Sequence, residues 1–224
     1  MKYIIRTYFL RKLIRRLHLT GFVKRFIFDA GYEESFDRFF HQNLRVGDYV
    51  VDCGANIGYY TRKYQSLVGE HGKVFAIEPS VVNFKKLSEI VAENIQFFNV
   101  AIGSESGFIE MIQGLDELGA TTKVLSENDN KKDSFKVEIT TLDSLFLNKR
   151  VDVLKIDVEG WELEVIKGGT RVLQNARVVG VEVHSSILET KGVNNPHKVI
   201  SGLLSDLGFT VIWTDFSHIV GIRN

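Results

Sequence analysis

Three ionisable side chains follow two apolar stretches in the second half of the sequence. Asp157 and Glu159 come after the β-favouring run 151–156, and His184 comes after the β-branched run 178–183. Parallel α/β sheets bind their ligands at the carboxyl ends of strands. Carboxylates and a histidine at such a place could act as a base or as ligands. Glu159 and His184 also have structural interpretations, as an acid at a helix start and as a hydrogen-bonded core histidine. Asp157 is harder to explain in this way, because it would lie where the fold places its ligand.

A second group of candidates surrounds a glycine turn that follows another apolar stretch. Asp52 precedes the turn, which contains Gly54, Ala55, Asn56 and Gly58. Glycines let the backbone approach a ligand closely, and the start of the helix behind them offers free N–H groups to an anionic group. With only two glycines, the turn lacks the dinucleotide pattern G-x-G-x-x-G. The alternative is a tight strand-to-helix turn that binds nothing.

An acid ends the next predicted strand, 73–78, twenty residues after the second glycine of the turn. A carboxylate at Glu78 can accept hydrogen bonds from both ribose hydroxyls of an adenosine-containing cofactor. A lone acid at a strand end is usually only solvated, but this spacing from the glycine turn favours a cofactor site. The predicted third strand, 95–101, should bring Asn99 and Ala101 near the adenine.

These strand ends have to be positioned by an α/β sheet with helices between the strands. Behind the glycine turn, apolar residues recur with the period of a helix, at Tyr60, Tyr64, Leu67 and Val68. Ser80 is a candidate N-cap for a helix that directs Phe84, Leu87 and Val91 toward the core. The polar stretch 114–134 is long for a connection and is predicted to be a substrate lid or disordered. The pattern predicts a Rossmann-like, doubly wound sheet with helices on both faces.

Length and composition indicate one soluble domain with a short extension. The chain has 224 residues, 44% of them hydrophobic and 25% charged, and we expect a helical extension over residues 1–45 and the α/β domain over residues 46–224. Cys53, the single cysteine, excludes an internal disulfide and fits a reducing cytoplasm. Its place inside an apolar strand favours a small buried side chain over a nucleophile.

The N-terminal segment concentrates positive charge. Eight Lys or Arg residues against Asp29 give residues 1–30 a net charge of +7, so the remainder carries −7. Apolar residues at helical spacing predict a basic amphipathic helix, with Leu10, Leu13, Ile14 and Leu17 on one face. Such a helix could contact an anionic membrane surface or pack on the domain, and we expect the second. No apolar run is long enough for a transmembrane span or a signal peptide.

Several motifs occur together in a fixed order. They are Asp52-Cys-Gly-Ala-Asn-Ile-Gly-Tyr-Tyr-Thr61, Glu78-Pro79, Thr141-Leu-Asp143, Leu154-Lys-Ile-Asp-Val-Glu-Gly-Trp-Glu162 and Glu182-Val-His184. Together they resemble the FkbM family of S-adenosylmethionine-dependent methyltransferases, from about Tyr49 to the C-terminus. The glycine turn alone resembles only the class I superfamily, whereas the Lys-Ile-Asp-Val-Glu-Gly-x-Glu run discriminates the family. The resemblance also implies a mostly parallel sheet that closes with an antiparallel C-terminal hairpin.

The resemblance implies O-methylation of a hydroxyl on a sugar, glycolipid or polyketide. It places S-adenosylmethionine on Asp52, Gly54, Ala55, Asn56, Gly58, Glu78, Pro79, Ala101 and Asp157. His184 is then the candidate base or acceptor orienter, and Asp157 and Glu159 would hold the acceptor or the cofactor's ammonium. These three side chains could instead hold a divalent cation that acidifies the hydroxyl.

Two other functions remain open at this stage. A nicotinamide-dependent dehydrogenase would share the fold, but the missing dinucleotide pattern counts against it. A non-catalytic adaptor could keep the fold and dock on membranes through residues 1–30. We expect a small-molecule or glycan acceptor, no nucleic-acid partner, and a location in the cytoplasm or at a membrane surface. The sequence leaves the acceptor and the oligomeric state open.

Overall fold

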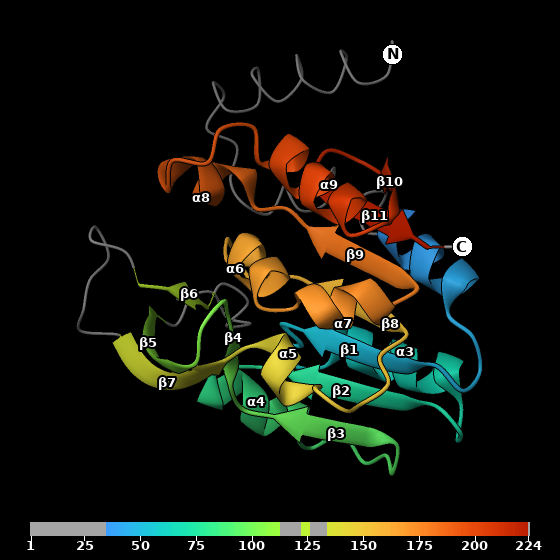
Figure 1. The fold of residues 1–224 in the computed structure, drawn as a ribbon. Helices are drawn as coiled ribbons and strands as arrows, with labels where there is room; N and C mark the ends of the chain where they lie inside the picture. The colour runs from blue at the N-terminus through green and yellow to red at the C-terminus, as the bar shows by residue number, and fades with distance from the viewer. Residues whose placement is uncertain (1–34, 113–121, 126–133, 224) are drawn as a thin grey trace, which may run out of the picture.

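The computed structural model describes residues 35–112, 122–125 and 134–223. Seven strands form the main sheet in the order β10-β11-β9-β8-β1-β2-β3, with its helices packed on it (Figure 1). The five strands from β9 to β3 run parallel, and β11 pairs antiparallel with both β9 and β10. The strands are β1 (Tyr49–Cys53), β2 (Lys73–Ile77), β3 (Ile95–Phe98), β8 (Val153–Ile156), β9 (Val178–Glu182), β10 (Thr210–Trp213) and β11 (His218–Ile222). The predicted mostly parallel sheet and antiparallel hairpin are confirmed.

Helices cover both faces of this sheet. The helix of residues 35–43, α3 and α4 pack on one face, whereas α5, α6, α7 and α9 pack on the other. Successive strand residues divide between the two cores, with Val50 in one and Val51 in the other, because side chains alternate along a strand. The helices are α3 (Tyr59–Val68), α4 (Val81–Leu87), α5 (Leu142–Leu145), α6 (Glu162–Lys167), α7 (Thr170–Asn175), α8 (Ser185–Thr190) and α9 (Pro196–Asp206).

A second, four-stranded sheet stands beside the first and corrects the predicted third strand. Its order is β4-β7-β5-β6, from β4 (Ala101–Ile102), β7 (Ser134–Thr140), β5 (Gly107–Ile112) and β6 (Lys123–Val124). The stretch 95–101 is therefore not one strand, because β3 ends at Phe98 and Ala101 pairs with Ile139 of the other sheet. At the break, Asn99 Nδ2 donates to the carbonyls of Glu78 and Pro79. Of the predicted polar stretch 114–134, the structure describes residues 122–125, which include β6, and Ser134 at the start of β7.

The helix after Ser80 is shorter than predicted. Ser80 caps it as expected, by accepting a hydrogen bond from the Asn83 backbone N–H. The helix ends at Leu87, however, and Val91 is 99% exposed rather than part of the core. The chain forms a turn at residues 88 and 89, so the helical period predicted from the sequence does not reach Val91.

The helix of residues 35–43 packs on the domain. Phe36 and Phe40 are buried against β9, where a Cβ on Gly180 would lie 2.5 Å from Phe40 Cζ. The glycine therefore makes room for the phenylalanine rings. The predicted amphipathic helix of residues 1–30 lies outside the described residues, and the predicted domain boundary after residue 45 stays a prediction. Within the described residues, no helix is long and apolar enough to cross a membrane.

Candidate active site

A pocket lies at the carboxyl ends of β1, β2 and β8, and the small sheet forms its far wall. Seven of the predicted site residues line it, namely Gly54, Asn56, Glu78, Pro79, Ala101, Asp157 and Glu159. Apolar side chains of the small sheet complete the wall, among them Ile109, Met111, Val124 and Ile139. A mostly apolar cleft with a few polar groups at strand ends is the usual form of a small-molecule site.

Glu78 is held at the end of β2 by two backbone donors. Its Oε2 accepts from the Asn56 N–H at 2.9 Å and its Oε1 from the Ser80 N–H at 2.9 Å. Burial raises the pKa of this carboxyl to about 7, although both hydrogen bonds and the charge of Lys155 act in the opposite direction. The side chain is thus fixed by the glycine turn and the helix cap while lining the pocket.

The glycine turn is shaped by a close approach between two strand ends. Gly54 has φ +80°, and a Cβ there would lie 1.7 Å from the carbonyl oxygen of Asp157. Any side chain at this position would separate β1 from the chain after β8. Asn56 also has positive φ, while Ala55 donates its N–H to the Ile77 carbonyl. Gly58, with φ +90°, precedes α3.

Asp52 does not line the pocket. It is fully buried, accepts from Thr61 Oγ1 at 2.6 Å, and lies 3.3 Å from Lys155 Nζ. Lys155, which is 2% exposed, also lies 3.1 Å from Asp157 Oδ2 and donates to the Gly54 carbonyl. Burial lowers the pKa of Lys155, but the charges of Asp157 and Asp52 outweigh it and raise the pKa. Asp52 is therefore not part of the pocket wall, and it contacts the site through Lys155.

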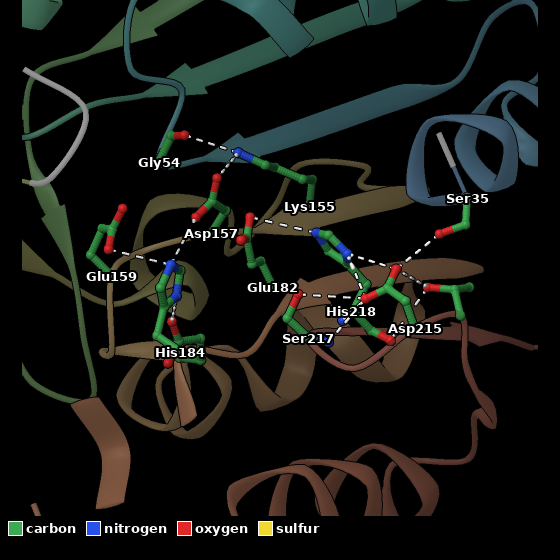
Figure 2. Close-up of polar contacts among 12 residues, drawn as sticks. Ser35, Gly54, Lys155, Asp157, Glu159, Glu182, His184, Asp215, Ser217 and His218 are labelled. Atoms are coloured by element: carbon green, nitrogen blue, oxygen red, sulfur yellow. Dashed lines mark hydrogen bonds and ion pairs between the residues drawn. The ribbon is translucent and has the colours of Figure 1, made fainter. Parts of the chain in front are cut away.

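The three candidates for acid–base chemistry, Asp157, Glu159 and His184, lie close together. His184 Nε2 lies 3.3 Å from Glu159 Oε2 and 3.9 Å from Asp157 Oδ1, as Figure 2 shows. Burial raises the pKa of Glu159 to about 7, and the charge of His184 only partly opposes this. Burial also favours a raised pKa for Asp157, but Lys155 and His184 lower it below its usual value. Glu159 has φ +50°, a conformation that is rare for a non-glycine residue and often marks a functional site.

Glu162 supports the candidate site, although in the sequence it was only the last residue of a motif. It is fully buried and its Oε1 lies 2.7 Å from His184 Nδ1. Burial lowers the pKa of His184, but Glu162, Glu159 and Asp157 raise it to about 10. The imidazole in this arrangement therefore keeps its proton at neutral pH and is a poor general base. It is placed to orient Glu159.

A buried histidine of the C-terminal hairpin, His218, lies next to this cluster. His218 Nε2 lies 3.6 Å from Glu182 Oε2, and its Nδ1 lies 2.9 Å from Asp215 Oδ2. The ring stacks on Phe36, with centroids 4.3 Å apart, and Ser35 Oγ donates to Asp215. The hairpin and the helix of residues 35–43 thus fix the carboxylate at the end of β9 (Figure 2).

A family model for the methyltransferase FkbM domain matches residues 52–211, most of the chain. The chain belongs to the FkbM methyltransferase family. The resemblance drawn from the motifs is thereby confirmed, and with it the methyltransferase class.

Two relatives of this FkbM methyltransferase carry methyltransferase names. Hexuronic acid methyltransferase AglP of Haloferax volcanii is 28% identical over 201 residues, covering 87% of this chain and 79% of AglP. Methyltransferase sdnD of Sordaria araneosa is 26% identical over 208 residues, covering 75% of this chain and 76% of sdnD.

Two solved structures share the fold. Methyltransferase FkbM from Methylobacillus flagellatus superposes with a TM-score of 0.57 at 15% identity, over 81% of this chain and 45% of its own. This chain therefore spans less than half the length of that protein. An S-adenosylmethionine-dependent O-methyltransferase from Thermotoga maritima gives 0.50 at 14% identity, over 86% of this chain and 65% of its own. These likenesses confirm the Rossmann-like methyltransferase fold.

Proposed function

We propose that this FkbM methyltransferase transfers the methyl group of S-adenosylmethionine to a hydroxyl oxygen of a sugar-containing acceptor. The main support is Glu78, a buried carboxylate fixed on the pocket wall at the end of β2. Each oxygen accepts one backbone N–H and keeps a further lone pair. The two ribose hydroxyls of the cofactor can use these lone pairs.

Two buried polar atoms on the pocket wall also fit this cofactor. Asn56 Oδ1 and Trp161 Nε1 have no hydrogen-bond partner among the described residues. A buried polar atom without a partner costs about 1–3 kcal/mol, so a ligand that supplies one is favoured. Asn56 could accept from the cofactor's ammonium, and Trp161 could donate to a ring nitrogen or a carboxylate. Ala101 and Ile102 offer apolar surface to the adenine.

The chemistry is a displacement in which acceptor oxygen, methyl carbon and sulfur must be aligned. The oxygen forms a bond to the methyl carbon, the carbon–sulfur bond breaks, and its electron pair leaves the sulfur neutral. Alignment can supply roughly 7–11 kcal/mol, and a positioned base typically adds 10²–10⁴-fold. Glu159 lines the pocket and is held by His184, so we assign it the role of the base that accepts the proton of the acceptor hydroxyl. His184 is then the positioning residue.

The acceptor class is inferred from the relatives. AglP is a hexuronic acid methyltransferase by name and aligns with most of this chain. Asp157 and Glu159 on the pocket wall can accept hydrogen bonds from neighbouring sugar hydroxyls.

Calorimetric titration with S-adenosylmethionine tests the proposed cofactor site. Glu78→Ala removes hydrogen bonds to a charged acceptor, each worth about 1.5–3 kcal/mol, so affinity should fall at least about tenfold. Glu110→Ala, an exposed acid on β5, is the matched control and should bind normally. Unchanged affinity for Glu78→Ala would rule out this placement, and binding of a nicotinamide nucleotide instead would favour a dehydrogenase.

Turnover of a sugar acceptor tests the chemical half. His184→Ala should lower turnover by about 10²-fold, because misplacing a reacting group by about 1 Å can cost that much, while cofactor affinity stays within a few-fold. Glu159→Gln should lower turnover similarly, because an amide cannot take up the proton. If His184→Ala turns over normally, the histidine is structural and does not position Glu159.

A further inference from the structure

Ligand atoms from three different side chains converge at the edge of the pocket. Asp157 follows β8, Glu182 ends β9 and His184 comes two residues later. One ligand atom from each lies within 4.8 Å of the others. Two ligands on opposite sides of an octahedral Mg²⁺ lie about 4.2 Å apart, and adjacent ones about 3 Å. Cation binding would therefore draw the three ligand atoms closer together.

We propose that Asp157, Glu182 and His184 bind a divalent cation of the Mg²⁺ or Mn²⁺ type. Two carboxylates with one imidazole form a mixed oxygen and nitrogen set, which suits Mn²⁺ and leaves positions for water or substrate oxygens.

The histidine is oriented as a metal ligand should be. Its Nδ1 lies 2.7 Å from Oε1 of the fully buried Glu162, so Nε2 is the nitrogen that faces the pocket, 3.3 Å from Glu159 Oε2 and 3.9 Å from Asp157 Oδ1. A carboxylate behind the second ring nitrogen is the common arrangement around metal-bound histidines, because it fixes the ring and makes the free nitrogen more basic. Cation binding at Nε2 would release the imidazole proton and replace the contact with Glu159. His184 would then act as a ligand in the cation-bound protein and as the positioning residue of Glu159 only in the cation-free protein.

The carboxylates of Asp157 and Glu182 each contact a basic side chain through one oxygen. Lys155 Nζ lies 3.1 Å from Asp157 Oδ2, which leaves Oδ1 toward His184. His218 Nε2 lies 3.6 Å from Glu182 Oε2 and is itself held by Asp215. Figure 2 shows Glu182 between Asp157 and His218. Each proposed ligand thus has its own supporting residue, as ordered metal sites require.

The cation site lies next to the pocket, so a bound cation could activate the acceptor hydroxyl. This role rests on the proposed function. Asp157 and Glu159 line the pocket, so a cation on Asp157 would reach the acceptor hydroxyl. The cation would make a hydroxyl bound to it more acidic. Glu159 would take up the proton while the oxygen bonds to the methyl carbon and the carbon–sulfur bond breaks. The Glu182 pair with His218 then keeps a ligand in place rather than acting in catalysis.

Mn²⁺ titration of the whole protein, without cofactor or acceptor, tests the site. Loss of the free-ion electron paramagnetic resonance signal should give saturable binding of one Mn²⁺ per chain. Glu182→Gln should weaken it at least about tenfold, and Glu162→Gln should weaken it by about 10–100-fold through the imidazole. Glu138→Gln, an exposed acid on β7, is the matched control and should bind normally.

Two results would overturn the proposal. The first is no saturable Mn²⁺ binding by the unaltered protein, and the second is binding by Glu182→Gln that equals the unaltered protein. Because the readout uses no cofactor and no turnover, failure of the cation site and failure of the methyl-transfer proposal appear in separate experiments.

Discussion

Replacing Lys155 with methionine should destabilise the protein strongly. The lysine side chain is 2% exposed, and its Nζ lies 3.3 Å from Asp52 Oδ1 and 3.1 Å from Asp157 Oδ2. Lys155→Met keeps most of the volume but leaves the fully buried Asp52 carboxylate without its cation. Removing one partner of a buried ion pair typically costs about 3–5 kcal/mol, because the other charge stays uncompensated.

Urea unfolding measures this loss. With an m-value of about 2–3 kcal/mol/M, the midpoint of Lys155→Met should fall by about 1–2.5 M. Lys167→Met is the matched control, because Lys167 is 56% exposed and pairs with Glu164 on the surface; it should cost less than about 1 kcal/mol. Adding Asp52→Asn to Lys155→Met should restore part of the loss. If Lys155→Met unfolds like Lys167→Met, Asp52 and Lys155 are not the buried charged pair described here.

Three further outcomes are expected. In urea unfolding, Gly54→Ala should lower the free energy of unfolding by at least about 2 kcal/mol more than Gly192→Ala. Both glycines have positive φ, but only a Cβ at Gly54 would lie 1.7 Å from the Asp157 carbonyl oxygen. Equal losses for the two variants would contradict this close approach. Cys53 is 1% exposed and burial raises its pKa, so a thiol reagent should modify it only as the protein unfolds, and rapid labelling of the folded protein would show otherwise. Deleting residues 1–30 should lower the melting temperature, and the whole chain should not sediment with anionic vesicles; salt-sensitive co-sedimentation would instead assign those residues to a membrane surface.

The strand-end residues could be predicted because their signal is local. Asp157 and His184 each follow an apolar run, and Glu78 ends another. The rule that parallel strands place their ends at one edge of the sheet then brings them together without further information. The contacts of His184 with Glu159 and Asp157 agree with that reasoning.

The supporting charges could not be predicted, because their partners lie far away in the sequence. Glu162 was only the last residue of a motif until the fold placed it against His184, and His218 reaches Glu182 only through the C-terminal hairpin. One signal was present in Lys155, a charged residue between Leu154 and Ile156 in a strand expected to be buried. A buried lysine requires carboxylates around it, and this requirement points to buried acids near β8.

The order of the strands explains why cofactor binding and chemistry should respond to different substitutions. β1 lies between β2, which carries Glu78 at its end, and β8, which carries Asp157. A change on the β2 side should therefore act on cofactor affinity, and a change at His184 on turnover. The cofactor side at β1 and β2 contacts the side at β8 where Gly54 approaches the Asp157 carbonyl. Since the glycine turn also positions the backbone that holds Glu78, a side chain at Gly54 is the change that should damage both properties together.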